Sequence, residues 1–413
     1  MSDLGPDAAL LRSARLAFEN DPPARIGFAV SGGGDSMAAL HLMVQVFGPS
    51  LCAVTVDHQL RPEAAEEARF VAGVCAGLGV SHQVLIWDHG TIPGNLQDQA
   101  RRARYGLMQD WAAGQGISAL VLAHTADDQA ETLLMGLARG AGIDGLAGMR
   151  PRWQAGGLCW RRPFLSHTRQ ELRDYLLRHG QDWRDDPSNE NDRFTRVKAR
   201  RALKALAPLG VTAGRLAQVA RHLAEAQEAL DHAVDAALAA HGHQETGAVS
   251  LDREALLALP GEVVRRLLVA VLRGIGGADH PPRGGDLDRL QVAIRQGRAA
   301  TLAGCRLLHK GPRLWLCREG RAVAGLASPS NALWDRRWRL TGPHRPGLEI
   351  RALGAAGLAL CPDWRGLNLP RPVLLSSPAI WDQGRLIAAP LAGKANGWQA
   401  ICPAVTASCN IAH

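Results

Sequence analysis

The sequence predicts an α/β protein with a doubly wound parallel sheet, followed by a helical segment and a small C-terminal α+β domain. Two observations carry this prediction. Short apolar runs alternate with helical segments early in the chain, and a glycine-rich turn joins the first apolar run to the helix after it. Later parts of the chain are first alanine-rich and then rich in proline and tryptophan. We therefore expect three domains, which span residues 1–205, 206–325 and 326–413.

Composition narrows the class of protein. The 413 residues carry a formal net charge of +8, mostly from arginine, which favours a polyanionic partner such as nucleic acid. The eight cysteines lie singly, without a Cys-x-x-Cys pair, so no zinc or iron–sulfur site is indicated. No apolar run approaches the length of a membrane span, and the start of the chain lacks the pattern of a signal peptide. We therefore expect a cytoplasmic protein with reduced thiols.

Four apolar runs predict buried strands, and the segments around them predict helices. The strands are expected at residues 25–30, 51–58, 83–87 and 118–123. The helices are expected at residues 8–20, 37–44, 62–78 and 95–113. Ligands of open α/β sheets bind beyond the carboxyl ends of the strands. Asp57 and His58, at the end of the second strand, are therefore candidates for contact with a nucleoside, and capping of the next turn by Asp57 is the equal alternative.

The glycine-rich turn predicts a phosphate site. Its three glycines expose backbone amides, its two serines add hydroxyl groups, and the following helix adds free amides and its dipole. Asp35 would repel a phosphate unless a cation lay between them, which makes it a candidate magnesium ligand or acid–base group. The turn lacks the lysine of a Walker A loop and the spaced glycines of a dinucleotide site; an ordinary tight turn is the alternative. The residues expected to bind the phosphates are Ser31, Gly32, Gly33, Gly34, Asp35 and Ser36.

An acidic cluster follows the fourth strand. His124 stands at the tip of the strand, and the next helix begins with Asp127 and Asp128. Glu131 lies four residues after Asp127, so these two side chains share one helix face. Acidic residues at a helix start often serve as caps, but capping does not account for the whole cluster. The alternative is a pocket for a cation, either a metal ion or an amino group.

Two segments are rich in basic residues. Arg101, Arg104 and Tyr105 share one face of the helix expected at 95–113, which is either a solvated face or a contact for phosphates or RNA. The run 193–204 contains six basic residues and no acidic residue, which favours a polyanionic partner. The six residues are Arg193, Arg196, Lys198, Arg200, Arg201 and Lys204.

The second half of the chain predicts helices and then β structure. A long helix is expected at 211–240, and the runs 301–308 and 313–318 predict the two strands of a hairpin. A small β-containing domain is expected past residue 325, and the stretch from Gln399 carries no clear pattern.

Together these motifs resemble one family, the tRNA(Ile)-lysidine synthases, which are PP-loop ligases of the ATP pyrophosphatase superfamily. The resemblance covers about residues 25–205. The turn at 31–36 resembles the PP-loop, and the segment 95–105 resembles the Ala-Arg-x-x-Arg-Tyr helix of the family. The segment 123–148 resembles its His-x-x-Asp-Asp-Gln-x-Glu-Thr motif and trailing glycines. The pair Arg162-Pro163 and the Asp-Pro-Ser-Asn sequence at 186–189 also match.

The resemblance implies an adenine nucleotide alpha hydrolase-like fold and an ATP-dependent ligation. ATP would adenylate the carbon 2 oxygen of the wobble cytidine in a CAU-anticodon isoleucine tRNA and release pyrophosphate. Free L-lysine would then attack that carbon and AMP would leave, which forms lysidine and changes the codon read from AUG to AUA. The resemblance implies ATP as co-substrate, Mg²⁺ as cofactor, no membrane partner, and a homodimer as a candidate assembly.

The resemblance also assigns roles to residues. Asp127 and Glu131 would bind lysine, and Asp35 would bind the metal ion. The implied catalytic residues are Asp35, Arg104, His124 and Asp127. The implied tRNA contacts are Arg101, Arg196, Lys198, Arg200 and Arg201, and the domains at 206–325 and 326–413 would bind tRNA as well.

Two other functions fit parts of the sequence. A PP-loop tRNA thiolase would share the fold, but the absence of paired cysteines argues against it. A nucleotide-dependent RNA-binding protein without catalysis would keep the basic segments, but the intact acidic residues and His124 argue against it.

Overall fold

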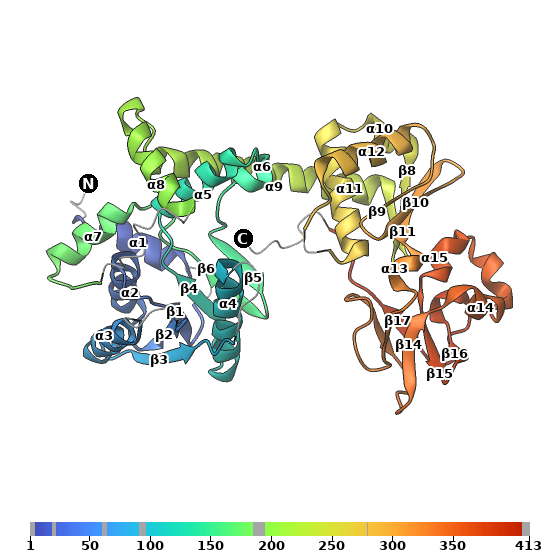
Figure 1. The fold of residues 1–413 in the computed structure, drawn as a ribbon, viewed down its shortest axis with the longest axis horizontal. Helices are drawn as coiled ribbons and strands as arrows, with labels where there is room; N and C mark the ends of the chain where they lie inside the picture. Colours follow the sequence, from blue (N-terminus) through green and yellow to red (C-terminus); the bar gives the residue numbers. More distant parts are fainter. Residues whose placement is uncertain are drawn as a thin grey trace. The chain divides into compact units, whose positions relative to one another are not determined.

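The computed structural model describes residues 5–18, 22–59, 64–90, 96–184, 195–278 and 280–406. The chain divides into two compact units, residues 1–227 and 228–411, and the division falls inside helix α9 (Ala213–His241) (Figure 1). The predicted domain boundaries after residues 205 and 325 stay predictions, because neither coincides with this division.

The first unit is built on a six-stranded sheet. Its strands are β1 (Ile26–Ala29), β2 (Leu51–Asp57), β3 (Ser81–Ile86), β4 (Ala119–Leu122), β5 (Arg152–Ala155) and β6 (Leu158–Arg161). They lie in the order β3-β2-β1-β4-β6-β5, and all neighbours are parallel except β5 and β6. All four predicted strands are therefore present, and the predicted α/β fold with a mostly parallel sheet is confirmed.

The hairpin of β5 and β6 was missed by the sequence analysis. Its strands have four residues each and are joined by Gly156 and Gly157, whose φ angles of +59° and +74° suit glycine. Trp153 and Trp160 stack across the hairpin with ring centroids 5.5 Å apart, and Trp160 lies opposite Leu120 of β4. A glycine pair between two short tryptophan-containing runs was the available signal.

Helices cover both faces of this sheet, as a doubly wound fold requires (Figure 1). The helices of this unit before α9 are α1 (Ala8–Leu16), α2 (Gly34–Phe47), α3 (Ala64–Gly77), α4 (Leu96–Gly114), α5 (Ala126–Ala138), α6 (Ile143–Leu146), α7 (Arg169–Arg178) and α8 (Thr195–Leu206). Ile26 and Phe28 of β1 pack with α1, α2, α3 and α7, whereas α4 packs on the opposite face. Gly27 lies against Trp111 of α4, where a Cβ atom would approach the indole ring to 3.1 Å. This close approach explains the glycine in the middle of a buried strand.

The second unit combines helices with three small sheets. Its helices of five or more residues are α10 (Arg253–Ala258), α11 (Gly261–Gly276), α12 (Gly284–Arg295), α14 (Gly354–Ala359) and α15 (Arg371–Leu375), and α13 (Gly320–Val323) is shorter. The first sheet has the order β7-β8-β11-β10-β9, with β7 (Gly242–Glu245), β8 (Ala248–Asp252), β9 (Ala300–Leu302), β10 (Cys305–Lys310) and β11 (Arg313–Arg318). The other sheets are β12-β14-β15-β16 and β13-β17, with β12 (Ala327–Pro329), β13 (Arg339–Thr341), β14 (Leu348–Ala352), β15 (Pro378–Asp382), β16 (Arg385–Ala388) and β17 (Gln399–Ile401).

One expectation about this unit needs correction. The run 301–308 forms two strands instead of one, because Ala303 and Gly304 adopt left-handed φ angles of +51° and +69° and turn the chain between β9 and β10. Residues Gln399–Ile401, which start the stretch without a clear sequence pattern, form β17 and pair with β13. The expected hairpin of β10 with β11 and the expected long helix are both present. Within the described residues, no helix is long and apolar enough to cross a membrane.

Candidate active site at the carboxyl edge of the sheet

The glycine-rich turn lies between β1 and α2. Ser36 closes it, because its hydroxyl group donates to the Gly33 carbonyl oxygen at 2.9 Å and lies 3.2 Å from the backbone nitrogen of Ser31. Gly32 has a φ of +84°, a left-handed conformation that suits glycine. No side chain caps the start of α2, so its first amides are not engaged by a cap. All six predicted phosphate-binding residues lie in this turn or the first turn of α2, and the geometry is that of an anion site.

The segment after α7 crosses over this turn. The backbone nitrogen of Arg184 donates to the Gly32 carbonyl oxygen at 2.9 Å. The position of a Cβ atom on Gly34 lies 3.4 Å from the Trp183 ring, so the ring packs directly on the loop. No sequence pattern indicated this contact of the segment with the glycines. The matched sequence at 186–189 and Arg193 lie outside the described residues.

Helix α5 begins with a capping box that separates the roles of its two aspartates. Thr125 is the N-cap residue, and Asp128 Oδ2 accepts hydrogen bonds from its backbone nitrogen at 3.0 Å and its hydroxyl group at 3.1 Å. Asp127 takes no part in this box: its Oδ2 accepts a hydrogen bond from the backbone nitrogen of Arg169 at 2.7 Å. Capping therefore accounts for Asp128 alone, and the rest of the acidic cluster needs another explanation.

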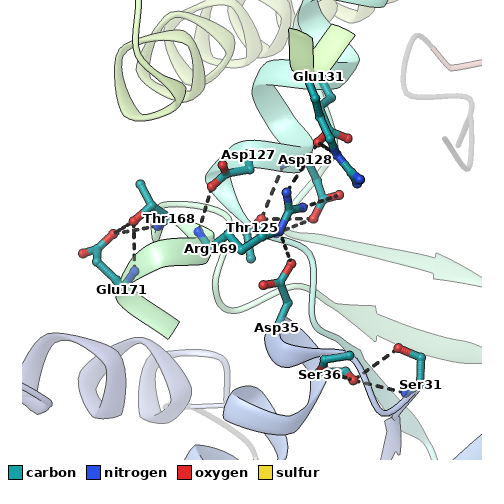
Figure 2. Close-up of polar contacts among 12 residues, drawn as sticks. Ser31, Asp35, Ser36, Thr125, Asp127, Asp128, Glu131, Thr168, Arg169 and Glu171 are labelled. Atoms are coloured by element: carbon teal, nitrogen blue, oxygen red, sulfur yellow. Dashed lines mark hydrogen bonds and ion pairs between the residues drawn. The ribbon is translucent and has the colours of Figure 1, made fainter. Parts of the chain in front are cut away.

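The side chain of Arg169 joins the glycine-rich turn to the acidic cluster (Figure 2). Its Nε donates to Asp35 Oδ2 at 2.9 Å. Its terminal nitrogens lie 3.8 Å from Asp128 Oδ1 and 3.7 Å from Glu131 Oε1. The turn after β1 and the cluster after β4 therefore meet, and a residue that the sequence analysis missed makes the connection. The only sequence signal was the capping box of Thr168 and Glu171, which marks Arg169 as the first residue of α7.

Burial shifts the pKa values of two carboxylates of this cluster, Asp35 and Glu131. Burial raises the pKa of Asp35, against the lowering effect of Arg169, and Asp127 and Asp128 raise it further. Burial likewise raises the pKa of Glu131, which is fully buried, and Arg200 opposes this effect. Asp35 Oδ1 and Glu131 Oε2 are buried and have no hydrogen-bond partner among the described residues. A buried carboxylate oxygen without a partner is costly, so each of these oxygens is a candidate ligand for a cation.

Helix α8 presents two different faces. Arg196 and Arg200 point to the acidic cluster: an Arg196 terminal nitrogen lies 3.8 Å from Asp128 Oδ1, and Arg200 Nε lies 2.6 Å from Glu131 Oε1. Lys198 and Arg201 are exposed. The predicted basic run is thus divided, because two of its arginines pair with carboxylates of the same unit. For Lys198 and Arg201, contact with tRNA stays a prediction, and their exposure favours it. For Arg196 and Arg200, contact with tRNA also stays a prediction, and it would require their side chains to leave the carboxylates.

His124 and Arg104 are each partly buried and lie beside this cluster. The Nδ1 of His124 accepts a hydrogen bond from Arg162 Nε at 3.1 Å, and burial together with the neighbouring arginines holds the pKa of His124 well below its usual range. Burial also lowers the pKa of Arg104, whose Nε has no hydrogen-bond partner among the described residues. Arg101 and Arg104 lie over the Tyr105 ring at 5.4 Å and 5.6 Å, so the predicted shared helix face is confirmed.

The end of β2 gives a mixed result. Asp57 Oδ1 accepts a hydrogen bond from the backbone nitrogen of Gln59 at 2.8 Å, which is the capping role. His58 packs edge-on against Trp87 with ring centroids 5.7 Å apart, and Arg104 contributes to the lowering of its pKa after the larger effect of burial. The Asp57 carboxylate therefore caps the turn that follows β2, and His58 lies near Arg104.

Comparisons with known proteins show what this chain is similar to. Residues 7–206 match the model of a PP-loop domain family. A tRNA(Ile)-lysidine synthase of Ruegeria pomeroyi is 50% identical over 394 residues, which cover 95% of this chain and 94% of that protein. A tRNA(Ile)-lysidine synthase of Zymomonas mobilis is 38% identical over 315 residues, 75% of this chain and 93% of that protein. Among solved structures, a U34-tRNA thiolase from Methanococcus maripaludis gives a TM-score of 0.46 at 14% identity, over 52% of this chain and 78% of that one.

Proposed function

Because this chain belongs to the tRNA(Ile)-lysidine synthase family, it is an ATP-using ligase that acts on tRNA, and we propose the finer features of its reaction as follows. Its substrate is the wobble cytidine of a CAU-anticodon isoleucine tRNA, and free L-lysine is the nucleophile. ATP adenylates the carbon 2 oxygen of the cytidine with release of pyrophosphate. The lysine amine then attacks carbon 2, and AMP leaves with the oxygen.

The meeting of the glycine-rich turn and the acidic cluster is the observation that carries this proposal. One guanidinium group, that of Arg169, lies 2.9 Å from Asp35 in the first turn of α2 and 3.7 Å from Glu131 in α5. A nucleotide held by the turn would therefore stand beside the carboxylates that suit an amine. Positioning and electrostatic stabilisation supply the catalysis in such an arrangement.

Asp35 fits the role of a magnesium ligand. Its Oδ1 is buried without a hydrogen-bond partner among the described residues, and it begins the helix whose amides face the proposed phosphates. Within the described ranges, no group of three or more His, Cys, Asp or Glu residues is arranged to hold a metal ion by itself. Mg²⁺ in nucleotide sites takes one or two carboxylates together with substrate phosphates, so a single aspartate is compatible with it. Bound Mg²⁺ would neutralise charge on the phosphates.

The acidic residues of α5 fit the second substrate. Asp127 and Glu131 would bind the cationic lysine, and the attacking amine must lose its proton before it reacts. Burial raises the pKa of Asp35, which makes its carboxylate the better proton acceptor in a state in which Asp35 does not coordinate Mg²⁺. Arg104 would stabilise negative charge on the adenylate, and His124 would contact the reacting nucleotide.

The exposed basic face of α8 fits the tRNA backbone. Lys198 and Arg201 are exposed, and Arg101 lies on the face of α4 that carries Arg104. We propose that these residues bind phosphates near the anticodon and that the parts at 206–325 and 326–413 bind the rest of the tRNA. Such contacts position the RNA without reading its sequence.

A transfer assay tests the proposal. Purified protein, ATP, Mg²⁺ and labelled lysine are incubated with isoleucine tRNA, and label in the tRNA and released pyrophosphate are measured. We expect both in equal amounts, and neither with a methionine tRNA that carries the same CAU anticodon or with ATP omitted. Pyrophosphate release without lysine incorporation, or incorporation of sulfur from a persulfide donor, would reject the proposal.

A further inference from the structure

We propose that Arg169 fills the ligation site of the free protein: its guanidinium group occupies the place of the substrate amine, and the amine displaces it. The inference rests on the proposed function, because it assumes that lysine enters among the carboxylates of Asp35, Asp127, Asp128 and Glu131. None of the motifs in the sequence assigns a role to Arg169.

The side chain of Arg169 lies where these carboxylates converge (Figure 2). Its Nε donates a hydrogen bond to Asp35 at 2.9 Å, and its terminal nitrogens lie 3.8 Å from Asp128 and 3.7 Å from Glu131. Only the first of these distances is that of a hydrogen bond, so the guanidinium group attracts the other two carboxylates without satisfying them. A substrate ammonium group carries three donors on a compact charge and could replace these looser contacts with hydrogen bonds.

The backbone of Arg169 is anchored independently of its side chain. Its backbone nitrogen donates to Asp127 at 2.7 Å, and the preceding Thr168 forms a capping box with Glu171. The start of α7 therefore stays fixed when the side chain moves. The Arg169 side chain is 23% exposed, so it has a route to solvent that does not require the helix to open.

The charges around Arg169 favour exchange for another cation. Three carboxylates, those of Asp35, Asp128 and Glu131, meet three guanidinium groups here, those of Arg169, Arg196 and Arg200. Two carboxylate oxygens, Asp35 Oδ1 and Glu131 Oε2, are buried without a hydrogen-bond partner among the described residues. Without Arg169, only two guanidinium groups would face the three carboxylates, so the Arg169 guanidinium group reduces their mutual repulsion until the cationic substrate arrives.

Occupancy by Arg169 has a measurable cost for the substrate. A ligand that must displace an internal group binds with an affinity reduced by the fraction of protein in which the site is open. Removal of the guanidinium group should therefore tighten lysine binding and leave turnover of the bound substrate nearly unchanged, because the side chain has already left the site when the amine reacts. If Arg169 had a merely structural role, its replacement would weaken lysine binding and slow turnover.

The test compares Arg169→Gln with the wild-type protein and with Arg178→Gln. Arg178 belongs to the same helix but pairs with Asp7, away from the site, so its variant is the matched control. Equilibrium dialysis with labelled lysine in the absence of ATP gives the dissociation constant, and the transfer assay gives kcat and KM. We expect Arg169→Gln to lower the dissociation constant by about threefold to tenfold and to leave kcat within about twofold of wild type, with no change in either value in Arg178→Gln. Millimolar methylguanidinium should compete with lysine in Arg169→Gln.

A measurement on the wild-type protein makes the inference independent of that variant. If lysine displaces the guanidinium group into solvent, modification of Arg169 by phenylglyoxal, followed by mass spectrometry, becomes faster when lysine is present. Protection or no change would overturn the inference, and so would an unchanged or raised lysine dissociation constant in a folded Arg169→Gln protein. Wild-type protein that incorporates no lysine would overturn the proposed function together with this inference, whereas the other adverse results leave the proposed function intact.

Discussion

Gly32 and Gly33 of the PP-loop differ in backbone conformation and surroundings, and we expect their alanine variants to separate fold stability from ATP binding. Gly32 has a φ of +84°, and a Cβ atom there would lie 3.3 Å from Val71 Cγ2. Gly33 has φ −72° and ψ 155°, which any residue adopts, and its Cβ position comes no closer than 3.8 Å to the Ser31 hydroxyl oxygen. Gly32→Ala therefore strains the fold, whereas Gly33→Ala adds a methyl group to the surface on which the phosphates would lie.

The expected magnitudes follow from these geometries. A left-handed alanine costs about 1–2 kcal/mol, which corresponds to a Tm lowered by about 2–8 °C in a unit of this size. Gly33→Ala should change the free energy of unfolding by less than about 0.5 kcal/mol. Its methyl group should nevertheless weaken ATP binding by about tenfold or more, or about 1.4 kcal/mol of binding free energy.

Thermal unfolding and ATP titration check both expectations. Gly48→Ala is the matched control, because Gly48 ends α2 with a φ of +51° and has no atom within 4 Å of its Cβ position. It should lower the Tm as Gly32→Ala does but leave ATP binding unchanged. Wild-type ATP affinity in Gly33→Ala would refute the assignment of this turn to the phosphates.

Three further predictions concern the cap, the buried charge and the basic face. Thr168→Ala removes the cap of α7 and should cost about 1 kcal/mol in thermal unfolding, with Thr168→Ser close to wild type; equal losses in both would contradict the capping role. Burial raises the pKa of Glu131 above its unfolded value, so the stability linked to its protonation is present below pH 4.5 and is lost as the pH rises through the folded pKa. The Tm of Glu131→Gln should therefore be higher than that of the wild-type protein at pH 7 but not at pH 4. A difference in Tm that does not depend on pH would exclude the ionisation of Glu131 as its cause. Lys198→Ala combined with Arg201→Ala should weaken tRNA binding and reduce the slope of log affinity against log salt concentration by about 2, and an unchanged slope would remove α8 from the interface.

The order of elements in the first unit could be predicted from the sequence because each inner strand is a short apolar run. The residues 51–56 of β2 and 119–122 of β4 are almost entirely buried, and their sequences contain few polar residues. The hairpin of β5 and β6 was missed because its strands alternate buried and exposed residues over only four positions. Such short alternation gives a weak periodic signal.

The pairing of charges could not be predicted, because it depends on tertiary contacts between distant segments. Arg200 meets Glu131 across 69 positions of sequence, and Arg169 meets Asp35 across 134. The basic run looked like a uniform surface for a polyanion, yet its residues 196 and 200 lie one helical turn apart and face α5. Sequence patterns identify which residues carry charge, but the fold decides which of them pair internally and which remain for a partner.

The hydrogen bond from Arg162 to His124 fixes how this imidazole can act. A guanidinium group only donates, so the Nδ1 that receives it carries no hydrogen. The lowered pKa keeps the ring neutral near pH 7, and its single hydrogen must then sit on Nε2. Any ligand atom that approaches Nε2 of His124 therefore meets a neutral hydrogen-bond donor, which can polarise an oxygen but cannot take up a proton there.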